Sequence, residues 1–185
     1  MSTWDKRYNE KEDEGIRPPS RILKELISRL PLGKALDLAC GDGRNAIFLA
    51  ERGFQVDAVD SSMAAVERGK SFAIEAGLNV NFICADLESF EIQRDSYHVI
   101  TNFYYLQRSL IPEMKKGLKE GGAILFETYT LEQKELGRPR NLDYLLGDNE
   151  LLQLFSDMHI SYYREGLYTE GEAKKALATV LCGKK

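Results

Sequence analysis

The stretch that decides the fold is ALDLACGDGRNAIFLAERGFQVDAVD, which spans residues 35–60. It opens with an apolar segment that predicts a buried parallel strand, and this strand runs into a tight turn at Gly41 and Gly43. A helical spacing of apolar residues follows over 45–52, and a second apolar strand then ends at Asp60. Ligands of open α/β sheets bind outside the carboxyl ends of the strands, so the turn and Asp60 are expected to face one ligand. The stretch therefore predicts a nucleotide or nucleoside site.

The glycine turn fits two kinds of nucleoside ligand. Gly41, Gly43 and Ala46 satisfy the dinucleotide pattern G-x-G-x-x-A, and Asp60 follows at the spacing typical of NAD-binding proteins. Asp37 argues against a dinucleotide, because a carboxylate on this strand would repel the pyrophosphate and is costly to bury unpaired. It suits a ligand that carries a cation, such as the ammonium of a methionine moiety. An NAD-binding oxidoreductase is the alternative.

A third acid, Asp86, follows the next apolar strand, and no basic residue is reserved for a pyrophosphate. Three acids at three successive strands favour S-adenosylmethionine. The chain resembles the class I S-adenosylmethionine-dependent methyltransferases and, within them, the tellurite-resistance type of small methyltransferase. One departure is Ala39, which replaces the first glycine of the commonest loop in that superfamily. The resemblance is carried by WDKRY (4–8), DLACGDGRNAIFLAERGFQVDAVD (37–60), CADLESF (84–90), NFYYLQRSLIPEMKKGLKEGGAILFETYT (102–130) and GRPRNLDYLL (137–146).

The predicted elements alternate between strands and helices, which indicates an α/β fold. The resemblance implies a Rossmann-like three-layer sandwich, in which helices cover both faces of a seven-stranded, mostly parallel sheet with an antiparallel C-terminal strand. No stretch has the composition of a linker, so residues 1–185 are expected to form a single methyltransferase domain. Residues 1–19 are too polar for a core and are expected to form an N-terminal arm or lid.

Composition argues against several classes of partner. The 185 residues carry a formal net charge of −4 and no basic run, so no nucleic-acid partner bound through its phosphates is expected. The three cysteines are widely spaced and form no C-x-x-C pair, so neither a disulfide framework nor a metal site is expected. Neither a long apolar span nor a signal peptide is present, which predicts a cytoplasmic protein without a membrane partner. We expect a monomer or a homodimer.

The resemblance implies a role for each acid at the cofactor, S-adenosylmethionine, which leaves as S-adenosylhomocysteine. Asp37 is expected to hold the methionine ammonium, Asp60 the ribose diol and Asp86 the exocyclic amine of adenine. Trp4 and Arg7 are expected to fold over the cofactor as part of a lid, with simple docking on the domain surface as the alternative. The other cofactor-binding candidates are Ala39, Gly41, Gly43, Asn45, Ser61, Met63, Leu87, Asn102 and Phe103.

Two sequence features each allow a second interpretation. Asn45 opens a predicted helix, and its side chain suits capping of that helix as well as ligand contact. The run NFYY, residues 102–105, invites comparison with the N-P-P-Y signature of methyltransferases that act on amino groups of nucleobases and glutamine. Both prolines of that signature are missing here. Methylation of a nucleobase or of a protein amino or amide group is therefore an alternative function.

The acceptor of the methyl group is expected to be a small molecule. No histidine is placed at a strand end of the active face, so no general base and no catalytic residue is assigned. Thiolates and the oxyanions tellurite and selenite carry their own lone pair and need no strong base, which makes them the expected acceptors. A module that binds the cofactor without catalysis is an alternative of another class. The family pattern gives as candidates for the substrate pocket Tyr104, Arg108, Glu127, Tyr129, Arg138 and Arg140.

Overall fold

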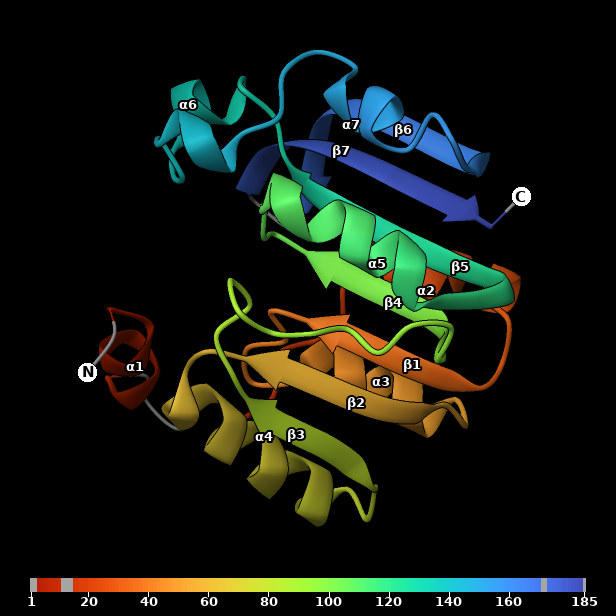
Figure 1. The fold of residues 1–185 in the computed structure, drawn as a ribbon. Coiled ribbons are helices and arrows are strands. Elements are labelled where there is room, and N and C mark those ends of the chain that lie inside the picture. The colour runs from red at the N-terminus through yellow and green to blue at the C-terminus, as the bar shows by residue number, and fades with distance from the viewer. Residues whose placement is uncertain (1–2, 11–14, 171–172, 185) are drawn as a thin grey trace.

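The structure of the protein is a computed structural model that describes residues 3–10, 15–170 and 173–184. Its centre is a seven-stranded sheet in the order β3-β2-β1-β4-β5-β7-β6 (Figure 1). β7 runs antiparallel to both β5 and β6, and the other pairings are parallel. The predicted α/β sheet with its antiparallel C-terminal strand is thus confirmed. The strands are β1 (Lys34–Leu38), β2 (Gln55–Asp60), β3 (Val80–Cys84), β4 (Tyr97–Phe103), β5 (Leu118–Tyr129), β6 (His159–Glu170) and β7 (Ala173–Gly183).

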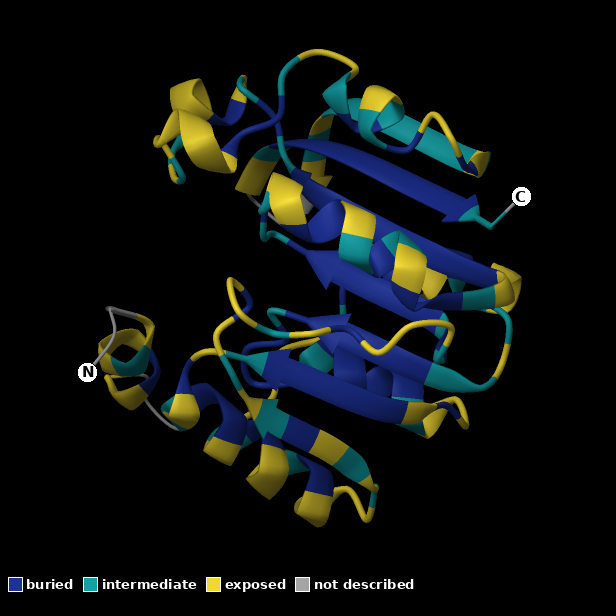
Figure 2. Ribbon diagram, viewed as in Figure 1, coloured by how far each residue is buried: buried dark blue, intermediate teal, exposed yellow. Residues whose placement is uncertain are grey.

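Helices cover both faces of the sheet and enclose two apolar cores. α2, α3 and α4 pack on the face that carries Ala35 and Leu125, whereas α5 and α7 pack on the face that carries Leu36 and Phe126. Neighbouring strand residues point to opposite faces, and Figure 2 shows the central strands buried between the two layers. The helices are α1 (Thr3–Asn9), α2 (Arg21–Leu26), α3 (Arg44–Glu51), α4 (Met63–Glu75), α5 (Ile111–Gly117), α6 (Gln133–Leu136) and α7 (Glu150–Leu154), with 3-10 turns η1 (Ile27–Arg29), η2 (Arg108–Leu110) and η3 (Leu142–Tyr144).

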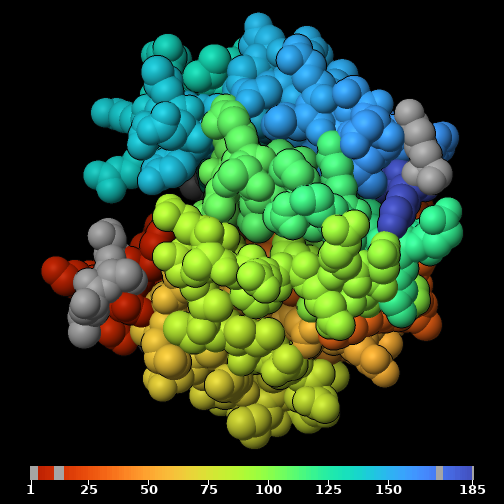
Figure 3. Space-filling view, viewed as in Figure 1, coloured from red at the N-terminus to blue at the C-terminus, as the bar shows by residue number. Residues whose placement is uncertain are grey.

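The carboxyl ends of the parallel strands meet at one edge of the sheet, on the left in Figure 1. β1 lies between β2 and β4, so the order of strands reverses at the β1–β4 pair. Such a switch point leaves a crevice at the carboxyl edge, where ligands of open α/β sheets bind. The space-filling view shows α1 (red) and the segment 131–147 (cyan) projecting from this same side (Figure 3). These two segments therefore flank the expected site.

Three elements differ from what the sequence pattern predicts. Apolar spacing predicts one helix over 21–30, but α2 ends at Leu26 and continues as the 3-10 turn η1. The polar arm, expected without secondary structure, contains α1. The last strand before the 131–147 segment is predicted to begin at Ala123 but begins at Leu118, because Leu118 already pairs with Tyr97 of β4.

None of the helices among the described residues has the length and apolar character needed to cross a membrane. In the same part of the chain, no three His, Cys, Asp or Glu side chains gather in a way that suits a metal ion. Cys40, Cys84 and Cys182 are free thiols.

The loop after β1 is built from left-handed backbone. Gly41 and Gly43 have φ of 57° and 80°, and Ala39 has φ of 52°. L-residues avoid this region because Cβ comes too close to the carbonyl oxygen, whereas glycine has no Cβ. Ala39 therefore adopts a conformation suited to glycine, at a cost in stability.

We expect Ala39→Gly to raise the free energy of unfolding by about 1 kcal/mol, because it relieves this strain. Gly53, with φ of 89° after α3, is the matched control, since a Cβ there would come no closer than 3.8 Å to Leu32. Gly53→Ala should lower the free energy of unfolding by about 1 kcal/mol through backbone strain alone. Urea denaturation followed by circular dichroism measures both variants, and a destabilised Ala39→Gly protein would contradict the argument.

Candidate functional site

The carboxyl end of β1 buries a carboxylate, Asp37, beside β4. Its side chain is 1% exposed, and the hydroxyl of Thr101 donates a hydrogen bond of 2.7 Å to Oδ1. The other oxygen, Oδ2, is buried and has no hydrogen-bond partner among the described residues. Burial raises the pKa of Asp37 to about 7, and the Thr101 hydroxyl and the Arg44 charge oppose this shift. Because a buried oxygen without a donor is costly, Oδ2 is suited to a cationic or hydrogen-bond-donating group of a ligand.

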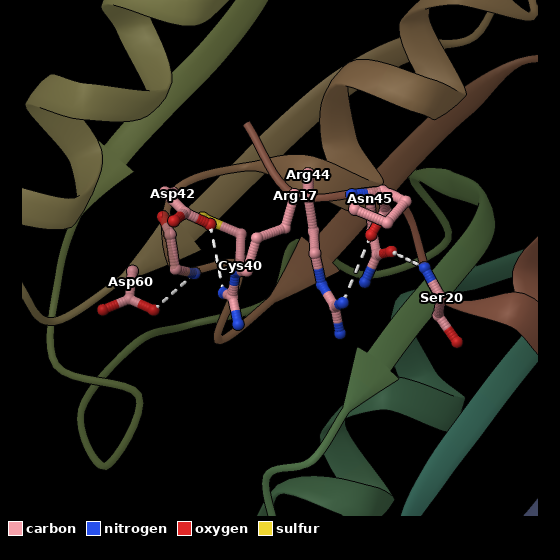
Figure 4. Close-up of polar contacts among 9 residues, drawn as sticks. Arg17, Ser20, Cys40, Asp42, Arg44, Asn45 and Asp60 are labelled. Atoms are coloured by element: carbon pink, nitrogen blue, oxygen red, sulfur yellow. Dashed lines mark hydrogen bonds and ion pairs between the residues drawn. The ribbon is translucent and has the colours of Figure 1, made fainter. Parts of the chain in front are cut away.

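Asp60, at the end of β2, holds the glycine loop in place. Its carboxylate accepts a hydrogen bond of 2.7 Å from the backbone N–H of Gly41 (Figure 4) and one of 2.9 Å from that of Ser62. Burial raises the pKa of Asp60, and the two backbone bonds oppose the shift. Asp60 thus has a structural role besides the predicted ribose contact, and its oxygens have further lone pairs that suit ligand hydroxyls.

Close packing requires both glycines of the loop. A Cβ at Gly43 would lie 2.5 Å from the Phe82 ring, and a Cβ at Gly41 would lie 2.3 Å from the hydroxyl of Tyr8. Both distances are far below van der Waals contact, so any larger residue would displace its neighbour. Tyr8 was not assigned to the site from the sequence, because nothing local in the polar arm indicates its contact with a loop more than thirty positions away.

The helix α1 docks at the start of α4, beside the glycine loop. Asp5 accepts a hydrogen bond of 2.8 Å from the hydroxyl of Ser62, and Tyr8 is buried. Burial, with nearby carboxylates, raises the pKa of Tyr8 to about 12. Trp4 is 53% exposed, and the Arg7 guanidinium lies 5.2 Å from the centroid of its ring. The arm therefore contacts the domain through Asp5 and Tyr8, while Trp4 and Arg7 stack on each other at its outer side.

Residues 17–20 form a second contact between the N-terminal segment and the site. Arg17 pairs with the buried carboxylate of Asp42 at 3.4 Å, and Arg44 donates a hydrogen bond of 3.2 Å to the carbonyl of Pro18 (Figure 4). Asp42 belongs to the turn before α3, and Arg44 is the first residue of that helix. The segment is thus clamped across the loop that follows β1.

Asn45 joins α3 to this segment instead of capping the helix. The N-cap position belongs to Gly43, and Asn45 lies inside α3. Its Oδ1 accepts a hydrogen bond of 2.8 Å from the backbone N–H of Ser20, and both residues are buried. The capping alternative is therefore wrong, because a partner 25 positions earlier in the chain takes this oxygen. The predicted cofactor contact of Asn45 stays a prediction.

The predicted adenine side of the site is more open. β2 and β3 end next to each other, which brings Asp60 beside Cys84 and near the segment that follows β3. In that segment Asp86 is exposed, and its Oδ1 accepts a hydrogen bond of 3.0 Å from a backbone N–H two residues on. Leu87 is buried, and Met63, at the start of α4, is 51% exposed. Ser61 is also exposed. Their cofactor contacts stay predictions.

The end of β4 places polar and aromatic groups next to Asp37. Asn102 is buried, and its amide nitrogen donates a hydrogen bond of 2.7 Å to the carbonyl of Tyr105. Its Oδ1 is buried without a hydrogen-bond partner among the described residues. Phe103 is buried, and Tyr104 follows with φ of 61°, an uncommon value for a bulky residue. The strand is therefore followed by a strained residue, and a second unsatisfied acceptor lies close by.

Glu127 on β5 is a buried carboxylate close to this strand end. It is 3% exposed, and it accepts hydrogen bonds from the hydroxyls of Thr179 at 2.8 Å and Ser20 at 3.5 Å. The backbone carbonyl of Glu127 accepts a hydrogen bond of 2.8 Å from the N–H of Tyr104. The centroid of the Tyr104 ring lies 5.2 Å from that of the Tyr129 ring. The structure thus brings together three of the residues predicted for the substrate pocket.

Arg108 does not belong to this group. Its guanidinium bonds Glu150 at 2.5 and 2.9 Å and also donates to two carbonyls of the segment 143–145. These bonds tie η2 to the loop before α7, so Arg108 has a structural role. Arg138 and Arg140 are exposed on the loop that follows α6. Their role in the substrate pocket stays a prediction.

The comparisons with known proteins agree with this geometry. Residues 35–122 match the family described as "Methyltransferase domain". The chain is 26% identical over 159 residues to "Hemagglutinin 1" of Eikenella corrodens, covering 83% of this chain and 53% of that protein. It is 25% identical over 140 residues to the "Probable S-adenosyl-L-methionine-dependent methyltransferase TehB" of Haemophilus influenzae, covering 72% of this chain and 49% of that protein. The chain thus spans about half the length of these curated relatives.

The fold is also similar to a solved structure. The crystal structure of TehB from Haemophilus influenzae superposes with a TM-score of 0.79 at 22% identity, covering 98% of this chain and 67% of that one. The match to the family and the similarity to TehB confirm the resemblance to class I methyltransferases that the sequence indicates.

Asp37 is expected to make the stability of the protein depend on pH. Its pKa is raised from the ordinary value of 3.8 to about 7, so the folded state binds more protons than the unfolded state between these values. The free energy of unfolding should therefore fall as the pH rises from about 4 to about 7, and level off above pH 7.

Asp37→Asn should remove this dependence, because the amide keeps the size and loses the charge. At pH 8 we expect the variant to exceed the wild type by roughly 2–4 kcal/mol in the free energy of unfolding. Asp57→Asn is the control, because the pKa of Asp57 is shifted in the opposite direction. Hydrogen bonds from Asn81, Lys34 and Tyr97 outweigh burial and lower it. That variant should be less stable than the wild type at pH 8. Urea denaturation from pH 5 to 8 measures both, and an Asp37→Asn protein that keeps the wild-type slope would refute the assignment.

Proposed function

We propose that this protein transfers a methyl group from S-adenosylmethionine to a small-molecule acceptor and releases S-adenosylhomocysteine. The observation that carries the proposal is the buried, unpartnered Oδ2 of Asp37 at the switch point of the sheet. A cationic ammonium group suits this atom, whereas a pyrophosphate does not. The match of residues 35–122 to the methyltransferase family supports the same function.

The residues at the carboxyl edge fit this cofactor. Asp37 would hold the methionine ammonium, Asp60 the ribose hydroxyls and Asp86 the adenine amine, with Met63 against the adenine face. The unsatisfied Oδ1 of Asn102 is a further acceptor at the same strand ends. When bound, the sulfonium supplies a methyl group that is already electrophilic.

The protein's own contribution is then positioning and exclusion of water. Gly41 is fixed by Asp60 and by the buried Tyr8, so the loop is preorganised before any ligand arrives. The clamp of residues 17–20 onto the turn before α3 covers this loop. The preorganised loop and its cover both favour an in-line methyl transfer, because they fix the geometry and exclude water.

The acceptor class is proposed from the chemistry that the pocket offers. A thiol or a chalcogen oxyanion such as tellurite or selenite brings its own lone pair to the methyl group, so neither needs a strong base in the pocket. Methylation of a nucleobase or of a protein amino group is less well supported, because residues 102–105 lack the two prolines of the N-P-P-Y signature.

Calorimetric titration with S-adenosylhomocysteine and, in parallel, with NADH tests the cofactor. We expect micromolar binding of S-adenosylhomocysteine and none of NADH. Asp60→Ala should weaken the binding by roughly 1.5–3 kcal/mol, the range for hydrogen bonds to charged groups. Asp95→Asn is the control, because Asp95 is an exposed residue that pairs with Lys184 away from the site. Binding of NADH instead would replace the methyltransferase function by an oxidoreductase.

We further propose that residues 1–19 act as a lid over the cofactor. The contacts of Asp5 with Ser62 and of Tyr8 with Gly41 support this role.

Deletion of residues 1–17 should weaken the binding of S-adenosylhomocysteine and lower methyl transfer, because it removes α1 and the Arg17–Asp42 pair. Trp4→Ala, at an exposed position, separates the effect of the tryptophan from that of the whole arm. Unchanged affinity and turnover in the deletion variant would leave α1 as a helix that merely docks on the surface.

A further inference from the structure

A row of polar side chains crosses three strands beside the predicted methyl-transfer site. Glu127 of β5 lies opposite Thr179 of β7, which in turn lies opposite Arg164 of β6. Residues directly opposite each other in a sheet point to the same face. Because Glu127 also bonds Ser20, this face is the one covered by the N-terminal segment. The row is therefore continuous with the candidate site and not with the opposite core.

Three cations lie over aromatic rings on this face. The Arg44 guanidinium is 5.6 Å and the Lys175 ammonium 4.9 Å from the centroid of the Tyr104 ring. The Arg164 guanidinium is 3.8 Å from the centroid of Tyr168, and its Nε is buried without a hydrogen-bond partner among the described residues. An N–H that is desolvated and unpaired needs an acceptor. Positive charge therefore lies over Tyr104, after the end of β4, and an unused donor lies on β6 of the same face.

Tyr104, which two of these cations contact, directly follows β4. Its left-handed φ of 61° costs energy for a bulky residue, and the bond from its N–H to the carbonyl of Glu127 helps to maintain it. Such strain persists when the surrounding structure fixes it, and it is concentrated at functional sites. The backbone that carries Tyr104 is therefore bonded to the backbone that carries the buried carboxylate of Glu127.

Resting on the proposed methyltransferase function, we propose that the acceptor is a small organic acid whose nucleophilic atom carries a proton. Lys175, Arg44 and Arg164 attract and hold its carboxylate. Glu127 accepts the proton of its thiol or hydroxyl. In the step, a lone pair of the acceptor atom forms the bond to the methyl carbon, the carbon–sulfur bond gives its electron pair to sulfur, and the proton passes to the Glu127 carboxylate. The sulfonium becomes a neutral thioether, so charge and atoms balance.

This arrangement favours a protic acid over a chalcogen oxyanion. Tellurite and selenite need no proton acceptor at the reacting atom, and a buried carboxylate beside them would repel their negative charge. A protic nucleophile next to Glu127 loses its proton to that same carboxylate. The proposal therefore narrows the acceptor class given above and replaces Arg108, Arg138 and Arg140 as the groups that hold the anion.

The test uses the full chain, S-adenosylmethionine with a labelled methyl group and three acceptors: 2-mercaptobenzoate, its neutral amide 2-mercaptobenzamide, and selenite. The acid should exceed the amide in kcat/KM by about tenfold or more, the factor that one charge-assisted hydrogen bond supplies. Lys175→Gln should reduce this preference several-fold. Lys174→Gln is the matched control, because the neighbouring side chain points to the opposite face of β7 and is exposed.

Glu127→Gln tests the proton acceptor. Its kcat with 2-mercaptobenzoate should fall by about 100-fold at neutral pH, the order expected for loss of a general base. Raising the pH should restore the rate, since the thiolate formed in solution has no proton to lose, whereas a purely structural defect would persist. Unchanged binding of S-adenosylhomocysteine confirms that the variant is folded.

The outcomes separate the proposal from the function on which it rests. Failure of the wild type to bind S-adenosylhomocysteine would remove the methyltransferase function itself. Binding without turnover of the acid, equal turnover of acid and amide, or faster turnover of selenite than of either thiol would overturn the acceptor class alone. A Glu127→Gln protein whose rate stays low at high pH would overturn the role of Glu127. The comparison of Lys175→Gln with Lys174→Gln would still decide whether the site prefers a charged acceptor.

Discussion

The burial of one carboxylate between β1 and β4 is the constraint on which the rest of the site depends. Asp37 is 1% exposed, and the Thr101 hydroxyl satisfies one of its oxygens while the other has no partner among the described residues. A fold that serves stability alone gains nothing from such a group, because an apolar residue would pack there without a desolvation cost. The raised pKa of Asp37 reports the same cost. A buried carboxylate at position 37 is explained if a cationic ligand binds its second oxygen.

Around this carboxylate, the N-terminal segment and the glycine loop stabilise each other. Asp60 fixes the N–H of Gly41, Tyr8 packs its hydroxyl against that glycine, and residues 17–20 are bonded to the turn before α3. These are contacts between parts of the chain that are far apart in sequence. A change in the arm therefore alters the contacts of the loop. This links closure of the arm physically to preorganisation of the cofactor site.

The acceptor side differs in character from the cofactor side. Acids dominate at the ends of β1, β2 and β3, whereas cations lie over the rings of Tyr104 and Tyr168. Ligand groups of opposite charge are thus expected on the two sides of the strained end of β4. Glu127 is a buried carboxylate within the cationic side, and it is the group to which we assign acid–base chemistry there.

Sequence alone determined the α/β class, the glycine loop and the three acids at strand ends, because strand periodicity and turn residues are local properties. It also indicated Glu127, Tyr104 and Tyr129. It placed Arg108 in the pocket, and the structure adds the bonds of Arg108 to Glu150; it suggested Asn45 as a helix cap, which the structure corrects. Glu150 and Ser20 lie far along the chain from these residues, and only tertiary contact assigns such partners.

The residues that sequence analysis missed were also placed by tertiary contacts alone. Tyr8, Arg44, Arg164 and Lys175 carry no local signal, since single polar residues on an arm, a helix or a strand are usually solvated. Their positions follow from the register of β5, β7 and β6 and from the docking of the arm. The chain by itself therefore fixed where the strands end and which acids stand there, while the pairing of distant strands decided which charges face one another.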